Sequence, residues 1–213
     1  MLRAGVVAVQ GDVSEHAAAI ERAARIHGEE AEVVEIRQAG LVPDCDVLLL
    51  PGGESTTISR LLRSEGIAEE VEAHVDAGKP VLATCAGLIV ASTDAKDDRV
   101  DPLGVLDVTV DRNAFGRQKD SFEAPLDVDG LDDPFPAVFI RAPLIDDASD
   151  VEILARWGDD PVAVRDGPVV GTSFHPELTE DVRLHRLAFF DGVDEVGDDG
   201  DGGDSETAAV GVE

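Results

Sequence analysis

Residues 81–89 of the chain read VLATCAGLI, an apolar run that leads into Cys85 and continues with small residues typical of a helix start. A tight turn from strand to helix lifts a nucleophile off the carboxyl edge of a sheet, and small neighbours prevent clashes there. We therefore predict that Cys85 occupies a nucleophile elbow. The N-terminus of the following helix favours a thiolate. A buried structural cysteine is the alternative, and the strand–helix context argues against it.

Strand-like and helix-like segments alternate before this turn. Apolar runs predict strands at 2–9, 31–36, 47–50 and 80–84. Helical periodicity predicts helices at 14–27, 55–63 and 66–77. Because short loops join these segments, we expect a parallel sheet with helices on both faces.

The pattern changes after residue 102. Segments with a period of two predict shorter strands, some of them antiparallel, at 103–111, 122–128, 137–140, 151–156, 161–165 and 168–174. A last helix is expected at about 180–190. The predicted fold class is α/β, a three-layer α/β/α sandwich with a mixed, largely parallel sheet.

The C-terminal segment 191–213 holds nine acidic residues, six glycines and no Lys or Arg. Such a segment cannot bury enough apolar area to offset the entropy of ordering. We therefore predict one folded domain at 1–190 and a disordered, acidic, Gly-rich tail at 191–213.

The charge of the whole chain narrows the possible partners. It has 46 Asp and Glu against 17 Lys and Arg, a formal net charge of −29. Such a surface repels nucleic acid and anionic membranes. Asp outnumbers Glu by 28 to 18 and only three cations are lysines, which favours a salt-rich cytoplasm where charge repulsion is screened.

The chain shows no secretory leader at its N-terminus and no apolar run near the ~20 residues of a spanning helix. Cys45 and Cys85 lie forty residues apart, which fits neither a disulfide framework nor a zinc site. We therefore expect a cytoplasmic protein.

A second motif, GTSFHPE at 171–177, places His175 and Glu177 two residues apart after a predicted strand. Side chains at i and i+2 of an extended chain lie on the same side, and Pro176 favours an extended His175. Glu177 could then accept a hydrogen bond from His175 and leave the other ring nitrogen facing the thiol. An isolated His-Pro-Glu is more often a surface turn, and its pairing with the elbow favours catalysis.

A third motif, LPGGEST at 50–56, forms a glycine turn between a predicted strand and a helix. Its amides would face the sheet edge that also carries the elbow. Gly53 and Ala86 could then supply the two N–H groups of an oxyanion hole, each donor typically worth ~10²–10³ in rate. A plain capped turn is the alternative, and a phosphate loop is disfavoured because the Gly-Lys pattern is missing.

Six motifs occur in order along residues 4–190: QG with EH at 10–16, PGGEST at 51–56, CAGL at 85–88, RNAFGRQ at 112–118, FIRAP at 139–143 and FHPELT at 174–179. Together they resemble the triad (class I) glutamine amidotransferases, and in particular the glutaminase subunits of pyridoxal 5′-phosphate synthases. The resemblance implies hydrolysis of L-glutamine to L-glutamate and ammonia. The ammonia would pass to a synthase (lyase) subunit that makes pyridoxal 5′-phosphate, a form of vitamin B6.

The resemblance also implies roles for individual residues. Cys85 would be the nucleophile, His175 the base and Glu177 the residue that orients it. Glutamine would be held by Gly53, Glu54, Ser55, Arg112, Ile140 and Arg141. A guanidinium fork suits a carboxylate, although composition alone would favour ordinary ion pairs for both arginines.

Gln10 and His16 are expected to contact the partner or to position the site. The reaction needs no cofactor, and no metal is expected because the remaining histidines lack ligand spacing. Ala83 departs from the family, which usually has Gly at that position. The alternatives are a glutaminase of another biosynthetic amidotransferase, a cysteine peptidase or hydrolase, and a non-enzymatic binding module.

Overall fold

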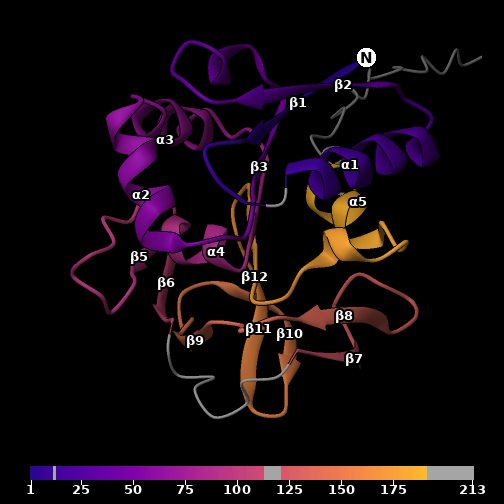
Figure 1. Cartoon of the computed structure of the whole chain (residues 1–213). Helices are drawn as coiled ribbons and strands as arrows, with labels where there is room; N and C mark the ends of the chain where they lie inside the picture. The colour runs from indigo at the N-terminus through magenta and orange to yellow at the C-terminus, as the bar shows by residue number, and fades with distance from the viewer. Residues whose placement is uncertain (12, 113–120, 191–213) are drawn as a thin grey trace, which may run out of the picture.

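The computed structural model describes residues 1–11, 13–112 and 121–190, and within them seven strands form one sheet (Figure 1). These strands are β1 (Leu2–Val7), β2 (Ala31–Ile36), β3 (Val47–Leu50), β4 (Val81–Thr84), β10 (Glu152–Trp157), β11 (Asp160–Asp166) and β12 (Val169–Thr172). Their order across the sheet is β10-β11-β12-β4-β3-β1-β2. The five strands from β12 to β2 are parallel, and β11 and β10 add an antiparallel edge. The predicted mixed, largely parallel sheet is confirmed.

Helices cover both faces of this sheet. They are α1 (Val13–His27), α2 (Ser55–Ser64), α3 (Ala68–Asp76), α4 (Ala86–Ala91) and α5 (Arg183–Phe189). Figure 1 shows α1 and α5 on one side of the strands and α2, α3 and α4 on the other. Two short 3-10 turns, η1 (Val42–Asp44) and η2 (Pro176–Leu178), complete the helical segments of the described chain.

The described residues also form two smaller sheets. Strands β5 (Ser92–Asp94), β6 (Leu106–Asp111) and β9 (Leu144–Asp147) make one, and the hairpin of β7 (Phe122–Leu126) and β8 (Phe135–Phe139) makes the other. The sequence did not predict β5 and β9. They are only three and four residues long, so neither shows the alternation of a longer half-buried strand.

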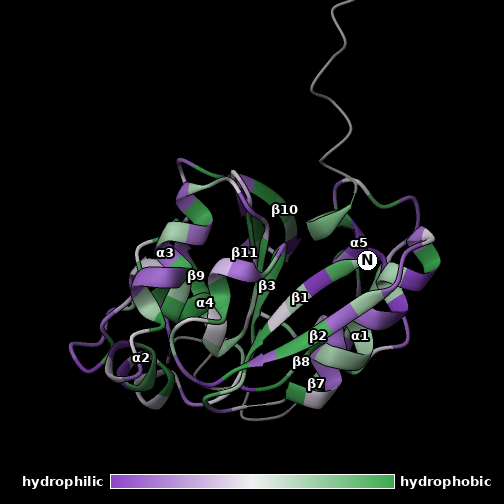
Figure 2. Cartoon of the chain, turned by 90° about the horizontal axis from the view of Figure 1, so that it is seen from above, coloured by the Kyte–Doolittle hydropathy of each residue, from purple (hydrophilic) through white to green (hydrophobic). Residues whose placement is uncertain are grey.

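Apolar side chains pack into one core on each face of the main sheet. Figure 2 shows the central strand β3 in uniformly apolar colours, whereas the edge strand β2 and the helices mix apolar and polar residues. This pattern follows from burial, because a central parallel strand is covered on both faces and an amphipathic helix on one.

Several sequence predictions need correction or lie outside the described chain. The last helix begins at Arg183, after the 3-10 turn η2, and the strand predicted at 103–111 begins at Leu106. The predicted disordered tail at 191–213 and residues 113–118 of the RNAFGRQ motif lie outside the described residues. None of the described helices is long and apolar enough to span a bilayer.

Candidate active site

Three loops meet at one edge of the main sheet. Leu50 at the end of β3 pairs with Ala83 of β4, and Thr84 of β4 pairs with Thr172 of β12. Because these strands are parallel and end together, the loops that follow them share the carboxyl edge, where open α/β sheets place their sites. The register therefore brings the PGGEST loop, Cys85 and the His175 segment together.

Cys85 sits in a strained turn between β4 and α4. Its φ of 51° and ψ of −106° lie outside the usual regions for a residue with a side chain. The turn is fixed from both sides, because the Cys85 N–H donates to the Thr172 carbonyl (2.8 Å) and the Cys85 carbonyl accepts from the Ile89 N–H (3.2 Å). The predicted strand-to-helix turn at Cys85 is thus present.

Small residues allow this turn to pack tightly. A side chain at Gly87 would collide with the Leu50 carbonyl of the neighbouring strand, so α4 can approach β3 only with glycine there. Ala83 is fully buried between its sheet partners Leu50 and Gly171, and its methyl group is accommodated. The departure from the family pattern at Ala83 therefore leaves the turn intact.

His175 and Glu177 form a buried pair. His175 Nδ1 lies 2.7 Å from Glu177 Oε1, and the two side chains are only 6% and 0% exposed. The predicted contact is present, but the predicted extended geometry is wrong. Glu177 lies in the 3-10 turn η2, and its carboxylate meets the imidazole from that turn.

The charges of this pair stabilise each other. Burial raises the pKa of Glu177, but hydrogen bonds from His16 and His175 outweigh that effect and hold the pKa below its usual range. Burial lowers the pKa of His175, but hydrogen bonding with Cys85 and Glu177 raises it to about 10. His175 therefore links the nucleophile to the carboxylate.

His16 approaches the same carboxylate from α1. Its side chain is fully buried, with Nε2 3.4 Å from Glu177 Oε1 and 3.2 Å from Thr84 Oγ1. A residue with no exposed surface cannot itself form a docking contact on this molecule. Of the two roles expected for His16, the structure favours positioning.

The glycine turn after β3 is held by Gln10. The Gln10 side-chain oxygen accepts a 2.7 Å hydrogen bond from the Glu54 N–H. A side chain at Gly52 would lie 2.6 Å from His175 Cε1, so glycine is required where the loop passes the imidazole. Sequence analysis did not include Gly52 in the site, although the double glycine was a signal for it.

Glu54 caps helix α2. Its carboxylate accepts hydrogen bonds from the N–H and hydroxyl groups of Thr56 and Thr57, and those bonds lower the pKa of Glu54 to about 2. Arg112 also reaches this carboxylate, at 3.4 Å, and contacts Asp97 at 3.2 Å. Asp97 was not predicted as part of the site, because nothing in the local sequence links it to Arg112.

Ile140 and Arg141 follow strand β8 and border the nucleophile. The Cys85 sulfur lies 3.9 Å from the Ile140 carbonyl oxygen. Arg141 has a positive φ of 45°, a second strained residue beside Cys85. The His175 N–H donates to the Val138 carbonyl of β8, so β8 is tied directly to the catalytic loop (2.8 Å).

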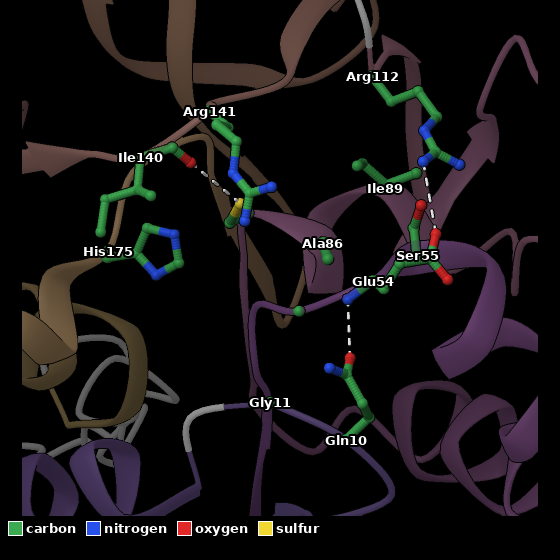
Figure 3. A pocket seen from close by; sticks show the side chains of 12 residues that line it. Gln10, Gly11, Glu54, Ser55, Ala86, Ile89, Arg112, Ile140, Arg141 and His175 are labelled. Atoms are coloured by element: carbon green, nitrogen blue, oxygen red, sulfur yellow. Dashed lines mark hydrogen bonds and ion pairs between the residues drawn. The ribbon is translucent and has the colours of Figure 1, made fainter. Parts of the chain in front are cut away.

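A cavity of about 510 Å³ opens over Cys85, and Figure 3 shows Arg112 and Arg141 reaching into it on the side opposite Gln10. Its lining residues are Gln10, Gly11, Gly53, Glu54, Ser55, Cys85, Ala86, Ile89, Arg112, Ile140, Arg141 and His175. Every predicted glutamine-binding residue thus lines one cavity together with the predicted nucleophile and base. Gly11 and Ile89 are additional lining residues that sequence analysis missed. Among the described residues, no group of three or more His, Cys, Asp or Glu side chains could hold a metal ion.

Comparison with known proteins shows the family of this chain. The model of the SNO glutamine amidotransferase family matches residues 6–194. The pyridoxal 5′-phosphate synthase subunit PdxT of Haloarcula marismortui is 78% identical over 194 residues, covering 91% of this chain and 98% of that protein. The PdxT subunit of Methanothrix thermoacetophila is 52% identical over 188 residues, covering 88% of this chain and 98% of that protein.

Solved structures give the same result. A crystal structure of a glutamine amidotransferase is 47% identical, with a TM-score of 0.78 over 87% of this chain and 96% of that one. The structure of PurLQS from Thermotoga maritima, 18% identical with a TM-score of 0.57, covers 83% of this chain and 88% of that one, and shares the fold alone. The relatives support the halophilic source that the acidic composition predicted. The chain is a member of the SNO glutamine amidotransferase family.

Proposed function

We propose that this chain hydrolyses L-glutamine to L-glutamate and ammonia, and passes the ammonia to the synthase (lyase) subunit of a pyridoxal 5′-phosphate synthase. The observation that carries the proposal is the alignment of Cys85, His175 and Glu177 beneath a cavity of about 510 Å³. The high identity to proteins named pyridoxal 5′-phosphate synthase subunits supports the partner. We assign the glutaminase domain to residues 1–190 and place the protein in a salt-rich cytoplasm.

The proposed reaction begins when the Cys85 thiolate attacks the side-chain amide carbon of glutamine. His175 lines the cavity together with Cys85 and carries the proton that the leaving ammonia takes. The resulting thioester is then hydrolysed by water, and Cys85 is restored. Glu177 holds the imidazole with Nδ1 toward the carboxylate, so that Nε2 serves the sulfur.

Backbone amides beside the nucleophile would stabilise the oxyanion. Ala86 is the first residue of α4, and the first N–H groups of a helix have no partner within the helix. We assign the second donor to Gly53, which lies in the glycine turn held by Gln10 through the adjacent Glu54 N–H.

The α-carboxylate and ammonium groups of glutamine need charged or polar partners at the cavity. Arg112 and Arg141 offer guanidinium groups for the carboxylate. The carbonyl of Ile140 lies beside Cys85, and Glu54 and Ser55 border the opposite wall, where they can meet the ammonium. These groups fix the length of substrate that reaches the sulfur.

The test is glutamine hydrolysis by the chain with and without its synthase subunit. We expect turnover in the complex, its loss in Cys85→Ala, and a mass shift at Cys85 after treatment with a glutamine-analogue alkylating agent. Ring synthesis from glutamine by the complex, again lost in Cys85→Ala but restored by added ammonium, would identify the acceptor. No hydrolysis and no mass shift in the complex would refute the proposal.

A further inference from the structure

The triad carboxylate has a second histidine partner on a distant part of the chain. We infer that His16 is a positioning residue for the glutaminase reaction: its Nε2–H fixes Glu177, and through Glu177 it fixes the tautomer and orientation of His175. The inference rests on the proposed function and adds a residue that touches neither substrate nor nucleophile. It starts from two contacts, 3.4 Å from His16 Nε2 to Glu177 Oε1 and 3.2 Å to Thr84 Oγ1.

Burial makes the second partner of the carboxylate necessary. The Glu177 side chain is 0% exposed, and a carboxylate removed from water is stable only when it is paired and hydrogen-bonded. His175 supplies one donor to Oε1, while Oε2 has no hydrogen-bond partner among the described residues. Without His16, His175 would be the remaining donor in the described chain that stabilises the negative charge of Glu177. That same imidazole must also exchange protons with Cys85.

The neighbours of His16 define its tautomer. Ionised Glu177 can only accept hydrogen bonds, so the nitrogen that faces it must carry a proton. That nitrogen is Nε2. The Thr84 hydroxyl can accept a hydrogen bond from Nε2–H, or it can rotate away from it. His16 Nδ1 is buried without a hydrogen-bond partner in the described part of the chain. Nε2 is therefore the ring nitrogen that donates to the carboxylate.

The charged and titratable groups around His16 come from η2, from α5 with the loop before it, and from α1 itself. Glu177 faces it from η2, and His175 lies on the far side of that carboxylate. His185 of α5 is fully buried, and burial, together with the nearby His16, lowers its pKa to about 3, so it is neutral. Arg22 and Asp181 act on the same group from α1 and from the loop before α5.

His16 also contacts the strand that carries the nucleophile. Thr84 is the last residue of β4 and directly precedes Cys85. One buried imidazole therefore contacts both the elbow strand and the carboxylate turn, whose supporting strands β4 and β12 already pair in the sheet. This position adds a contact from α1 to the two segments that carry the nucleophile and the base.

Three substitutions separate the donor from the volume of the ring. His16→Gln places an amide N–H near the position of Nε2, His16→Asn places it near Nδ1, and His16→Leu fills the space with no donor. Each is assayed for glutamine hydrolysis in complex with the synthase subunit. We expect His16→Leu and His16→Asn to lose about tenfold in kcat with KM unchanged, a part of the ~10²–10⁴ that a general base contributes. We expect His16→Gln to recover most of that loss.

A direct signature accompanies the kinetics. The Nδ1 proton of His175 lies in a 2.7 Å hydrogen bond and should give a downfield proton resonance, assigned by its loss in His175→Gln. We expect the resonance to move downfield in His16→Leu and His16→Asn, because the His175 hydrogen bond then carries more of the carboxylate charge, and to stay in place in His16→Gln.

His74 provides the matched control. It is also a buried histidine, 4% exposed, and its Nε2 contacts the Pro80 carbonyl at 3.3 Å on the opposite face of the sheet. We expect His74→Leu to lower the melting temperature without changing kcat or the His175 resonance. That combination is the result expected of a purely structural histidine.

The outcomes are distinguishable. If the wild-type complex does not hydrolyse glutamine, the proposed function fails. If it does, and folded His16→Leu keeps the wild-type kcat and resonance, the positioning role is refuted. Equal activity of His16→Gln and His16→Asn would also refute it, and this pair decides the question if His16→Leu does not fold.

Discussion

The candidate active site has two regions that differ in their exposure to water. The floor (Cys85, His175, Glu177 and His16) is a set of almost fully buried side chains. The rim (Glu54, Asp97, Arg99 and Arg112) is a chain of ion pairs in which Glu54 and Arg112 line the cavity, with side-chain exposures of 45%, 9%, 72% and 21%. Both regions hold charged groups in fixed places, but only the floor is buried throughout, whereas the rim includes exposed side chains such as Glu54 and Arg99.

This difference determines how each region responds to its surroundings. On the floor, a lost hydrogen bond leaves a buried charge unpaired, which is costly at any salt concentration. On the rim, exposed ion pairs are worth little and are screened further when the Debye length falls to roughly 3 Å in molar salt. The floor should therefore control turnover, and the rim should control substrate affinity in a salt-dependent way.

The largest effect is expected from Glu177→Gln. The substituted amide has nearly the same shape but can present its NH₂ group to His175, which favours the wrong imidazole tautomer. We expect kcat for glutamine to fall by about 10³–10⁴, as in other triads that lose the acidic member, at low and high salt alike.

Glu180→Gln is the control for this change. Glu180 is three residues away, its side chain is 97% exposed, and it lies 4.0 Å from Arg22. The kcat of the Glu180→Gln variant should match that of the wild type. A Glu177→Gln variant with normal turnover would show that the floor does not depend on a fixed tautomer.

An intermediate effect is expected from Arg112→Ala on the rim. Removing a charged hydrogen bond to the substrate carboxylate costs about 1.5–3 kcal/mol, so KM should rise about 10- to 100-fold while kcat changes little. The rise should shrink in molar salt, because screening weakens the interaction in the wild type.

Arg156→Ala is the matched control, because Arg156 is an exposed arginine on β10 that bonds only a nearby carbonyl in the described chain. It should leave KM unchanged. If Arg112→Ala reduced kcat and left KM intact, the rim would belong to the catalytic machinery and the division into two regions would be wrong.

The smallest effect concerns the pH dependence of folding. The pKa of His175 is raised from 6.5 to about 10, so the stability it contributes is complete below pH 6.5 and is lost as pH rises toward 10. The pKa of Glu177 is lowered, so its contribution is complete above about pH 4.5 and is lost as pH falls below that. The melting temperature should change with the free energy of unfolding, by about 2–4 °C for each kcal/mol.

Thermal melts from pH 4 to pH 10 would measure this dependence. The wild type should exceed His175→Gln most at pH 6 and lose that advantage by pH 10. A gap that grew with rising pH would mean that the imidazole is buried in its neutral form.

The sequence predicted the reactive side chains of the candidate site better than the residues that hold other site residues in place. Cys85 and the His-Pro-Glu motif carry local signals, since a strand, a small-residue turn and a helix are contiguous in the chain. Asp97, which holds Arg112, carries no such signal, because an ion pair between loops distant in sequence depends on how the elements pack. The same reason explains why strands β5 and β9 were missed.

The sequence alone therefore determined the alternation of strands and helices, the nucleophile elbow and the acidic surface, because each depends on neighbouring residues or on composition. Only the tertiary structure decided which groups meet. It replaced the expected extended geometry at Glu177 with a 3-10 turn, and it buried His16 of the first helix against a carboxylate from the far end of the domain. Contacts of this kind come from the register of the parallel strands and the packing of α1 on the sheet, which no local pattern encodes.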